Sequence, residues 1–278
     1  MVQKYQDQRI IRQYTMKTVL ILFVVTCLFA CNSNNKEETT TTETTKVEVK
    51  EPTTPKETEL YKPVPPTVNP IGQNGVPSDA IVLFDGTNLD AWQSSGNSSE
   101  ANWLLNDDGS MTVKNKSGNI QTKRNFGSVQ LHIEWQSPKD VQGKGQGRGN
   151  SGVFLQKRYE VQVLDNNDND TYVNGQVGSI YKQSIPLAKA SVPSGEWNTY
   201  DIIYHAPEFD DKGTKTTSAT ITVIHNNVLI QDHFEIKGSS EFIGWPKNNP
   251  HGKAPIMLQD HQDNSRVSYR NIWVRELD

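Results

Sequence analysis

An apolar residue stands at every second position of Val129-Gln130-Leu131-His132-Ile133-Glu134-Trp135. A strand turns successive side chains to opposite faces, so this period of two predicts a β-strand with one buried face and one wet face. The neighbouring sequence repeats short alternating stretches between Gly, Asn, Asp and Pro, and no long segment has a helical period. This pattern is typical of an all-β sandwich or barrel.

Further strands are predicted on the same grounds at residues 151–156, 159–164, 197–205 and 266–275. A hairpin is predicted as well, because two alternating stretches are joined around Asn226-Asn227. Asn tolerates the positive φ that a tight hairpin turn requires.

The chain of 278 residues divides by composition into residues 1–31, 32–77 and 78–278. The middle part is rich in Thr, Glu, Lys and Pro and cannot bury enough apolar surface to offset its ordering entropy, so we expect a disordered tether. The last part carries the predicted strands and is expected to be one β-sandwich domain. The formal net charge of -4 provides no basic footprint for phosphate backbones, so nucleic acid is not an expected partner.

The first part contains the one long apolar run, which follows Lys17 and a plausible true start at Met16. The run is too short to span a bilayer comfortably and has the form of an export signal. Leu28-Phe29-Ala30-Cys31 resembles a bacterial lipobox, which implies lipidation of Cys31; an ordinary secretory peptide is the alternative. Either way we expect an exported protein, and a lipid anchor would hold it to the membrane of the cell envelope, on the periplasmic face or the cell surface.

The cysteine count limits the chemistry further. Cys27 and Cys31 are the only cysteines, so the folded part has no thiol. Cysteine catalysis, thiolate metal sites and disulfides are therefore excluded there.

The strand at residues 159–164 is the first candidate for a site. Its alternation places Glu160 and Gln162 on the face opposite to the core, and a bulge after Val163 would bring Asp165 to that face. A carboxylate, an amide and a second carboxylate in a row suit sugar hydroxyls. The alternative is an exposed strand with ordinary polar residues on its wet side.

A second candidate follows in Ile256-Met257-Leu258-Gln259-Asp260-His261, where Gln259 and His261 share a face. Histidine exchanges a proton near neutrality, so His261 beside Asp260 is an acid/base candidate, although a lone histidine is often structural. Trp245, next to Pro246 in a loop, could offer a stacking face to a sugar.

Arg270 is the third candidate, because it has the same parity as Ile272 and Val274. In a regular strand its guanidinium would point to the buried side or the rim of a pocket. A buried Arg needs a carboxylate partner, which could be a site carboxylate or could form a purely structural ion pair.

Seven short motifs, in this order along residues 79–277, resemble the 3-keto-disaccharide hydrolase domain family. They are Leu83-Phe84-Asp85-Gly86-Thr87-Asn88-Leu89-Asp90-Ala91-Trp92, Asn150-Ser151-Gly152-Val153-Phe154-Leu155, Tyr159-Glu160-Val161-Gln162-Val163-Leu164-Asp165, Gly178-Ser179-Ile180-Tyr181, Glu196-Trp197-Asn198, Leu258-Gln259-Asp260-His261 and Arg270-Asn271-Ile272. The Gly-rich stretch 143–149 lengthens the loop before the second motif, and we expect it near the mouth of the site.

The resemblance implies a concanavalin A-like jelly roll of two antiparallel sheets and cleavage of glycosides oxidised to a ketone at sugar carbon 3. A base would remove the C2 proton, the group at C1 would leave by β-elimination, and water would add back. Carried onto matching positions, the resemblance implies proton transfer by Glu160, Asp165 and His261. It implies binding of hydroxyls or the developing enolate by Gln162, Tyr181, Gln259 and Arg270. Neither the resemblance nor the sequence decides whether a divalent cation is needed, so a cation remains a possible cofactor.

Two other functions fit the same fold. One is retaining glycoside hydrolysis, because Glu160 and Asp165 distantly resemble the carboxylate pair of laminarinase-like enzymes. The other is a non-catalytic carbohydrate-binding module, since fold alone does not fix function. The gathering of Glu160, Asp165, His261 and Arg270 favours an enzyme over a neutral-sugar platform.

Overall fold

A computed structural model describes residues 51–278 of the chain. The chain forms two units, Met1–Val64 and Pro65–Asp278. In the first unit, residues 51–64 are exposed and contain the short 3-10 helix η1 (Pro55–Glu57). The predicted signal region with Cys31, and part of the predicted tether, lie outside the described residues. Within residues 51–278, no helix combines the length and the apolar character needed to cross a membrane.

The regular secondary structure of the second unit is almost entirely β-strand, which confirms the all-β prediction. The strands are β1 (Ile81–Phe84), β2 (Trp92–Ser94), β3 (Leu104–Leu105), β4 (Met111–Thr112), β5 (Ile120–Thr122), β6 (Val129–Gln136), β7 (Ser151–Leu155), β8 (Tyr159–Val163), β9 (Asn198–His205), β10 (Glu208–Phe209), β11 (Lys215–Thr217), β12 (Thr220–His225), β13 (Val228–Glu235), β14 (Met257–Leu258) and β15 (Ser268–Glu276). The 3-10 helix η2 (Gln73–Gly75) precedes β1, and two more, η3 (Gly145–Gly147) and η4 (Val173–Gly175), lie between strands.

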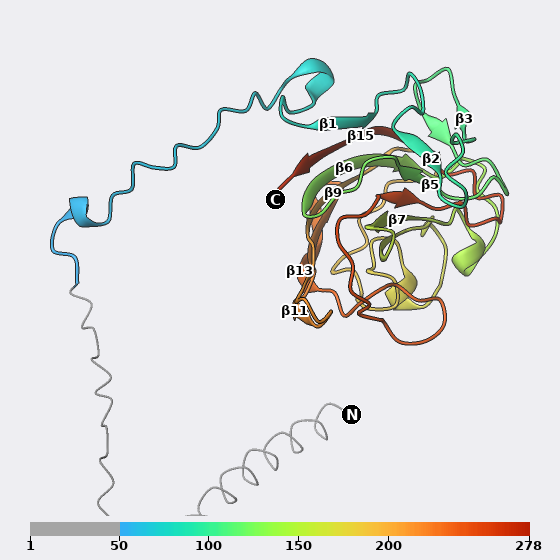
Figure 1. The fold of residues 1–278 in the computed structure, drawn as a ribbon. Coiled ribbons are helices and arrows are strands. Elements are labelled where there is room, and N and C mark those ends of the chain that lie inside the picture. Colours follow the sequence, from blue (N-terminus) through green and yellow to red (C-terminus); the bar gives the residue numbers. More distant parts are fainter. Residues whose placement is uncertain (1–50) are drawn as a thin grey trace, which may run out of the picture. The chain divides into compact units, whose positions relative to one another are not determined.

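The strands form two antiparallel sheets. The larger has the order β13-β12-β9-β6-β15-β4-β3, with β1 also paired to β15, and the smaller has the order β2-β5-β14-β7-β8. Figure 1 shows β6, β9 and β15 side by side in one layer and β5 and β7 in the other. A separate two-stranded ribbon joins β10 to β11. This arrangement is the two-sheet sandwich predicted from the sequence.

The core lies between the two sheets. β6 alternates strictly between buried and partly exposed residues, as its sequence predicts. The largest fully buried side chains include Trp92, Trp135, Tyr200, Tyr204, Tyr269 and Phe126. Each buried apolar side chain of this size contributes on the order of 2 kcal/mol to folding.

The predicted hairpin is present as β12 and β13. His225 pairs with Val228 across the turn, and Asn226 and Asn227 have φ values of 50° and 66°. Two successive positive φ values are the mark of the tight turn that suits the twist of a hairpin.

The edge of the smaller sheet at β8 is covered by the chain that follows it. Val161 forms a bridge to Ile180, and the Gln162 amide nitrogen of the backbone donates to the Ser179 carbonyl at 3.0 Å. This pairing protects the edge strand from other partners. It also places Tyr181 directly beside β8.

Candidate active site

A cavity of about 630 Å³ lies over β7, β8 and β14, on the side of the smaller sheet that faces away from the core. This volume is in the range of small-molecule sites. Five residues predicted from the sequence line it together: Glu160, Gln162, Tyr181, Gln259 and His261. The other lining residues are Gln146, Gly147, Asn150, Phe154, Tyr172, Ser240 and Phe242.

Glu160 lies at the floor of the cavity and is only 5% exposed. Its backbone is held by Ser240 Oγ, which accepts from the amide at 3.0 Å, and by Tyr181, whose amide donates to the carbonyl at 3.2 Å. Gly152 on β7 leaves room for the carboxyl group, because a Cβ there would lie 2.6 Å from Glu160 Oε1. Burial raises the pKa of Glu160 to about 8. A carboxyl group that exchanges its proton near neutrality is suited to acid/base catalysis.

The side-chain amide of Gln162 lies between Glu160 and Gln146. One end of the amide is 3.0 Å from Glu160 Oε1, and the other is 2.9 Å from Gln146 Oε1. With its nitrogen toward Glu160, the amide donates to an ionised carboxylate. With its oxygen toward Glu160, it accepts from a protonated carboxyl. Gln162 can therefore hydrogen-bond to Glu160 in both protonation states.

Tyr181 forms one wall of the cavity and pairs with Tyr172 through a hydroxyl–hydroxyl contact of 2.7 Å. Burial, together with this hydrogen bond, raises the pKa of Tyr181 well above its usual value. Lys182 Nζ lies 5.3 Å from the centre of the Tyr181 ring and 5.8 Å from that of Tyr172. Tyr181 therefore stays protonated at physiological pH and can donate to an oxygen of a ligand.

His261 lies at the opening of the cavity with its Nδ1 2.8 Å from Asp263 Oδ2. Since Asp263 engages Nδ1, Nε2 is the nitrogen free to exchange a proton with a ligand. Asp260, the neighbour suggested by the sequence, instead accepts from the backbone amides of Gly118 at 3.0 Å and Gln262 at 2.9 Å. The carboxylate that orients His261 is therefore Asp263.

Gln259 continues the pairing of β14 with β7. Its backbone amide donates to the Gly152 carbonyl at 3.1 Å, and its carbonyl accepts from Ser151 Oγ at 2.6 Å. These bonds hold the backbone while the side chain lines the cavity.

The Gly-rich loop supplies two polar groups to the site. Gln146 Nε2 donates to the Gly175 carbonyl at 2.9 Å, and the Gln146 carbonyl accepts from Asn150 Nδ2 at 2.7 Å. Asn150 Oδ1 is buried and has no partner within the described part of the protein. A buried acceptor without a partner, in a residue that lines a cavity, is a place for a ligand hydroxyl.

Asp165 does not line this cavity, contrary to its predicted role in proton transfer. Its carboxylate accepts from Ser137 Oγ and Ser194 Oγ, both at 2.6 Å, and from Arg148 Nε at 3.1 Å. Burial alone would raise the pKa of Asp165, but these bonds together lower it below its usual value. Asp165 instead fixes the end of the Gly-rich loop through Arg148.

Arg270 also lies away from the cavity, on the outer face of the larger sheet. A register shift between Arg270 and Trp273, with a φ of 46° at Asn271, breaks the regular alternation of β15. Arg270 Nε therefore donates to Glu134 Oε2 at 2.6 Å, and the guanidinium lies 4.2 Å from the centre of the Trp197 ring. The ion pair is structural, which was one of the two alternatives.

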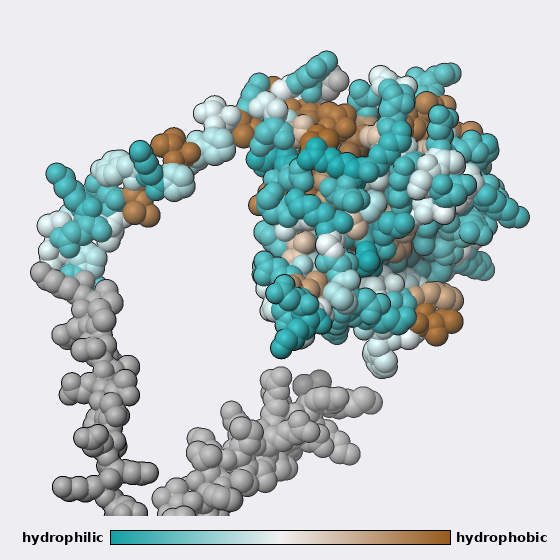
Figure 2. Space-filling model, in the orientation of Figure 1, coloured by the Kyte–Doolittle hydropathy of each residue, from teal (hydrophilic) through white to brown (hydrophobic). Residues whose placement is uncertain are grey.

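Trp245 lies near the cavity but does not line it. The residue is 88% exposed in the loop after β13, and it lines an adjoining cavity of about 400 Å³ with Tyr172 and Tyr181. Figure 2 shows apolar surface at the lower right of the molecule, over this loop.

Among residues 51–278, no group of three or more His, Cys, Asp or Glu side chains is arranged to hold a metal ion. The sequence leaves a divalent cation as a possible cofactor without deciding for it, and that question is unchanged.

Several lining residues were not predicted as site residues. Asn150 belongs to a motif that carries the family resemblance, and Gln146 to the Gly-rich stretch, so both had a sequence signal. Tyr172, Phe242 and the His261 partner Asp263 lie in loops without periodicity. Nothing in their spacing indicates that they meet.

Comparisons with known proteins agree with this architecture. The sequence model of a family described as "3-keto-alpha-glucoside-1,2-lyase-like domain" matches residues 79–275. A solved structure of a "putative glycosyl hydrolase" from Parabacteroides distasonis is 54% identical, with 81% of this chain and 97% of that chain covered and a TM-score of 0.77. A second structure with the same description and organism is 18% identical, with 72% and 94% covered and a TM-score of 0.54, and it shares the fold. No curated protein matches the chain.

Proposed function

The chain belongs to the 3-keto-alpha-glucoside-1,2-lyase-like family, and from this premise we propose that it cleaves 3-keto-glycosides by β-elimination followed by addition of water. The protein is a carbohydrate-active enzyme. The observation that carries the finer proposal is Glu160, a buried carboxyl group in the cavity whose pKa is raised to about 8.

The chemistry requires a base more than a nucleophile. A ketone at C3 acidifies the hydrogen on C2, so an ionised Glu160 can remove that proton. The C2–H electrons form the C1=C2 double bond as the C1–O bond to the leaving group breaks. Water then adds its oxygen to C1, and Glu160 returns the proton to C2. The sum of the two steps is hydrolysis of the glycoside.

His261 is suited to the leaving-group oxygen in this proposal. It lies at the opening of the cavity, and Asp263 holds its ring. A protonated His261 would donate to the oxygen as the C1–O bond breaks, and the neutral ring would then take a proton from the attacking water.

The remaining polar groups suit the sugar ring and the enolate oxygen. Tyr181 is a protonated donor in the wall of the cavity, while Gln162 and Gln259 offer amides. Asn150 Oδ1 offers a buried acceptor. Fixed donors beside a developing oxyanion lower the barrier to its formation.

Aglycone release tests the proposal directly. The purified protein would be given a chromogenic glucoside and its 3-keto derivative, each with and without EDTA. We expect release from the keto substrate alone, and loss of release with EDTA would add a cation to the mechanism. Release from the unoxidised glucoside would contradict the proposal, and saturable sugar binding without release would indicate a binding module.

Retaining glycoside hydrolysis receives less support from the same cavity. That mechanism uses two carboxyl groups about 5 Å apart. Glu160 is the one carboxylate among the described residues that line the cavity, because Asp165 is engaged elsewhere by Ser137, Ser194 and Arg148.

We also propose that the protein is exported and anchored to the cell envelope through a lipid on Cys31. The support is the short apolar run that ends in Leu28-Phe29-Ala30-Cys31. Incorporation of labelled palmitate into the wild-type protein, and its loss in Cys31→Ser, is the expected result. Labelling that persists in Cys31→Ser would contradict the anchor.

A further inference from the structure

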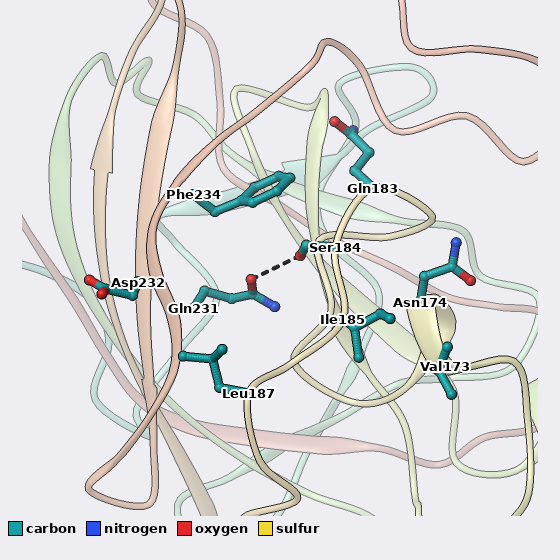
Figure 3. A pocket seen from close by; sticks show the side chains of 9 residues that line it. All are labelled: Val173, Asn174, Gln183, Ser184, Ile185, Leu187, Gln231, Asp232 and Phe234. Carbon is teal, nitrogen blue, oxygen red and sulfur yellow. Dashed lines mark hydrogen bonds between the residues drawn. The ribbon is translucent and has the colours of Figure 1, made fainter. Parts of the chain in front are cut away.

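Three cavities adjoin one another on this side of the second unit. The cavity that Glu160 lines and the cavity beside Trp245 share Tyr172 and Tyr181 as lining residues. The cavity beside Trp245 in turn shares Asn174 and Gln183 with a third, of about 590 Å³, which is drawn in Figure 3. Together they form a path that leads from Glu160 to the edge of the larger sheet at β13.

The middle of this path is an aromatic wall. Trp245 is almost fully exposed, although its loop is fixed: the Ser239 amide donates to the Lys247 carbonyl at 2.9 Å, and Lys182 Nζ donates to the Phe242 carbonyl at 2.5 Å. A large apolar side chain on a fixed loop loses the free energy of burial as long as its face meets water. A flat, apolar ligand would recover it.

The far end of the path is apolar. Ile185 is 57% and Leu187 is 68% exposed, and both line the third cavity with Phe234. The one charged lining residue is Asp232, whose side chain points away from the others in Figure 3.

Two of the three side-chain amides that line this end, those of Gln183 and Gln231, are already engaged, and Asn174 is the third. Gln231 accepts from Ser184 Oγ at 2.9 Å and donates to the Gly178 carbonyl at 2.8 Å. Gln183 donates to the Gly238 carbonyl and accepts from the Lys237 amide, both at 2.9 Å. Few free hydrogen-bond partners are therefore left for the hydroxyl groups of a second sugar. A sugar bound there would lose hydrogen bonds to water without replacing them.

We propose that the path from Tyr181 past Trp245 to Leu187 binds the leaving group, and that it selects glycosides with an extended, ring-containing, apolar aglycone over disaccharides. The inference rests on the proposed function, since cleavage at Glu160 defines which end of the ligand leaves. The sugar occupies the polar cavity, the first ring of the aglycone lies against Trp245, and the apolar remainder lies over Ile185 and Leu187.

The test uses three 3-keto-glucosides whose leaving groups are alcohols: ethyl, glucosyl and 2-(2-naphthyl)ethyl. We expect kcat/KM of the full protein to be at least about tenfold higher for the naphthylethyl substrate than for the other two, in line with the burial of one large apolar group. Trp245→Ala should lower that value about tenfold and Leu187→Ser about threefold, with the ethyl substrate unchanged. A preference for the glucosyl substrate, or equal losses on all three, would overturn the inference.

A second measurement separates this inference from the proposed reaction. Calorimetry with 2-(2-naphthyl)ethanol alone should detect binding to the wild-type protein and to Glu160→Gln, and weaker binding to Trp245→Ala. Binding of this pattern without turnover of any keto substrate would refute the proposed function and leave the aglycone site standing. No binding, or binding that Trp245→Ala leaves unchanged, would overturn the site even if the keto substrates are cleaved.

Discussion

Glu160 and Glu134 are two carboxyl groups on the outer faces of opposite sheets, and their surroundings differ in one respect. Glu160 is buried and holds no ion pair within the described structure, and its pKa is raised to about 8. Burial also acts to raise the pKa of Glu134, but the nearby His132 and hydrogen bonds from Asn271 and Arg270 lower it to about 2. Partners, more than depth, decide whether a carboxyl group in this sandwich stabilises the fold or is free to exchange a proton.

His132 shows the same principle on the side of Glu134. Burial would lower the pKa of His132, but its hydrogen bond with Asp201 and the nearby carboxylate of Glu134 raise it to about 9. The ring also stacks on Trp273 at a centroid distance of 5.0 Å. Charged side chains on the outer face of the larger sheet are thus paired with opposite charges, whereas Glu160 in the cavity has no ion-pair partner within the described structure.

The largest expected effect follows from replacing the unmatched carboxyl group. Glu160→Gln should reduce kcat on a 3-keto-glucoside about a thousandfold, because the amide cannot accept the C2 proton. Glu134→Gln is the matched control and should change kcat less than about threefold, since its side chain lies outside the cavity. Steady-state kinetics on both variants would measure the difference, and an active Glu160→Gln would remove Glu160 from the chemistry.

Asp165 offers the next largest effect, on stability. Asp165→Asn should lower the free energy of unfolding by about 3 kcal/mol, because Arg148, Ser137 and Ser194 lose a buried anionic partner. Urea denaturation would measure the loss. If Asp165→Asn keeps the stability of the wild-type protein but loses turnover, Asp165 has a catalytic role and the structural role is contradicted.

The pH dependence of turnover is the third effect. In the proposed reaction the ionised form of Glu160 is the base, so kcat/KM should fall about tenfold for each pH unit below about 8, or roughly a hundredfold at pH 6 relative to the plateau. A pH–rate profile would measure this limb. A flat profile between pH 6 and pH 8 would contradict the raised pKa.

The raised pKa of Glu160 has the opposite effect on stability: turnover rises with pH, whereas the free energy of unfolding falls. The folded protein keeps a proton on Glu160 up to about pH 8, while the unfolded chain releases it near the ordinary 4.5. The contribution of Glu160 to stability is therefore greatest below pH 4.5 and is lost as the pH rises to about 8. Glu160→Gln lacks this loss. The melting temperature of the variant, relative to that of the wild-type protein, should therefore rise as the pH increases from 4.5 to about 8.

The smallest expected effect is that of Arg270→Ala. Arg270 is partly exposed, so the loss of its pair with Glu134 should cost only about 1 kcal/mol of unfolding free energy. Turnover should stay within twofold of the wild-type value. A larger loss of kcat at unchanged stability would contradict this prediction and would show that Arg270, on the outer face, affects the reaction in the cavity.

The parts of the fold that depend on local pattern could be predicted from the sequence. The alternation of Val129–Gln136 and the positive φ values of Asn226 and Asn227 are set by neighbours along the chain. The face of Glu160 and Gln162 follows from the same period of two, which is why both were found.

The parts that depend on irregular backbone or on distant partners could not. The shift in β15 at Asn271 reverses the parity on which the predicted position of Arg270 rests, and a single Asn within an alternating stretch does not predict such a shift by itself. Asp165 is engaged by Ser137 and Ser194, which approach it only after the loops have folded. Carboxylates far apart along the chain look equally available until these partners are known.

The contact between Gln162 and Glu160 has a consequence for a reaction with two halves. In the proposed reaction, elimination begins with Glu160 as an anion and leaves it as an acid, and hydration reverses that order. A neighbour fixed in one orientation would favour one half at the expense of the other. If the Gln162 amide turns end for end, and the amide of Gln146 turns with it so that two oxygens do not face each other, the same pocket serves both halves without a movement of the strand that carries Glu160 and Gln162.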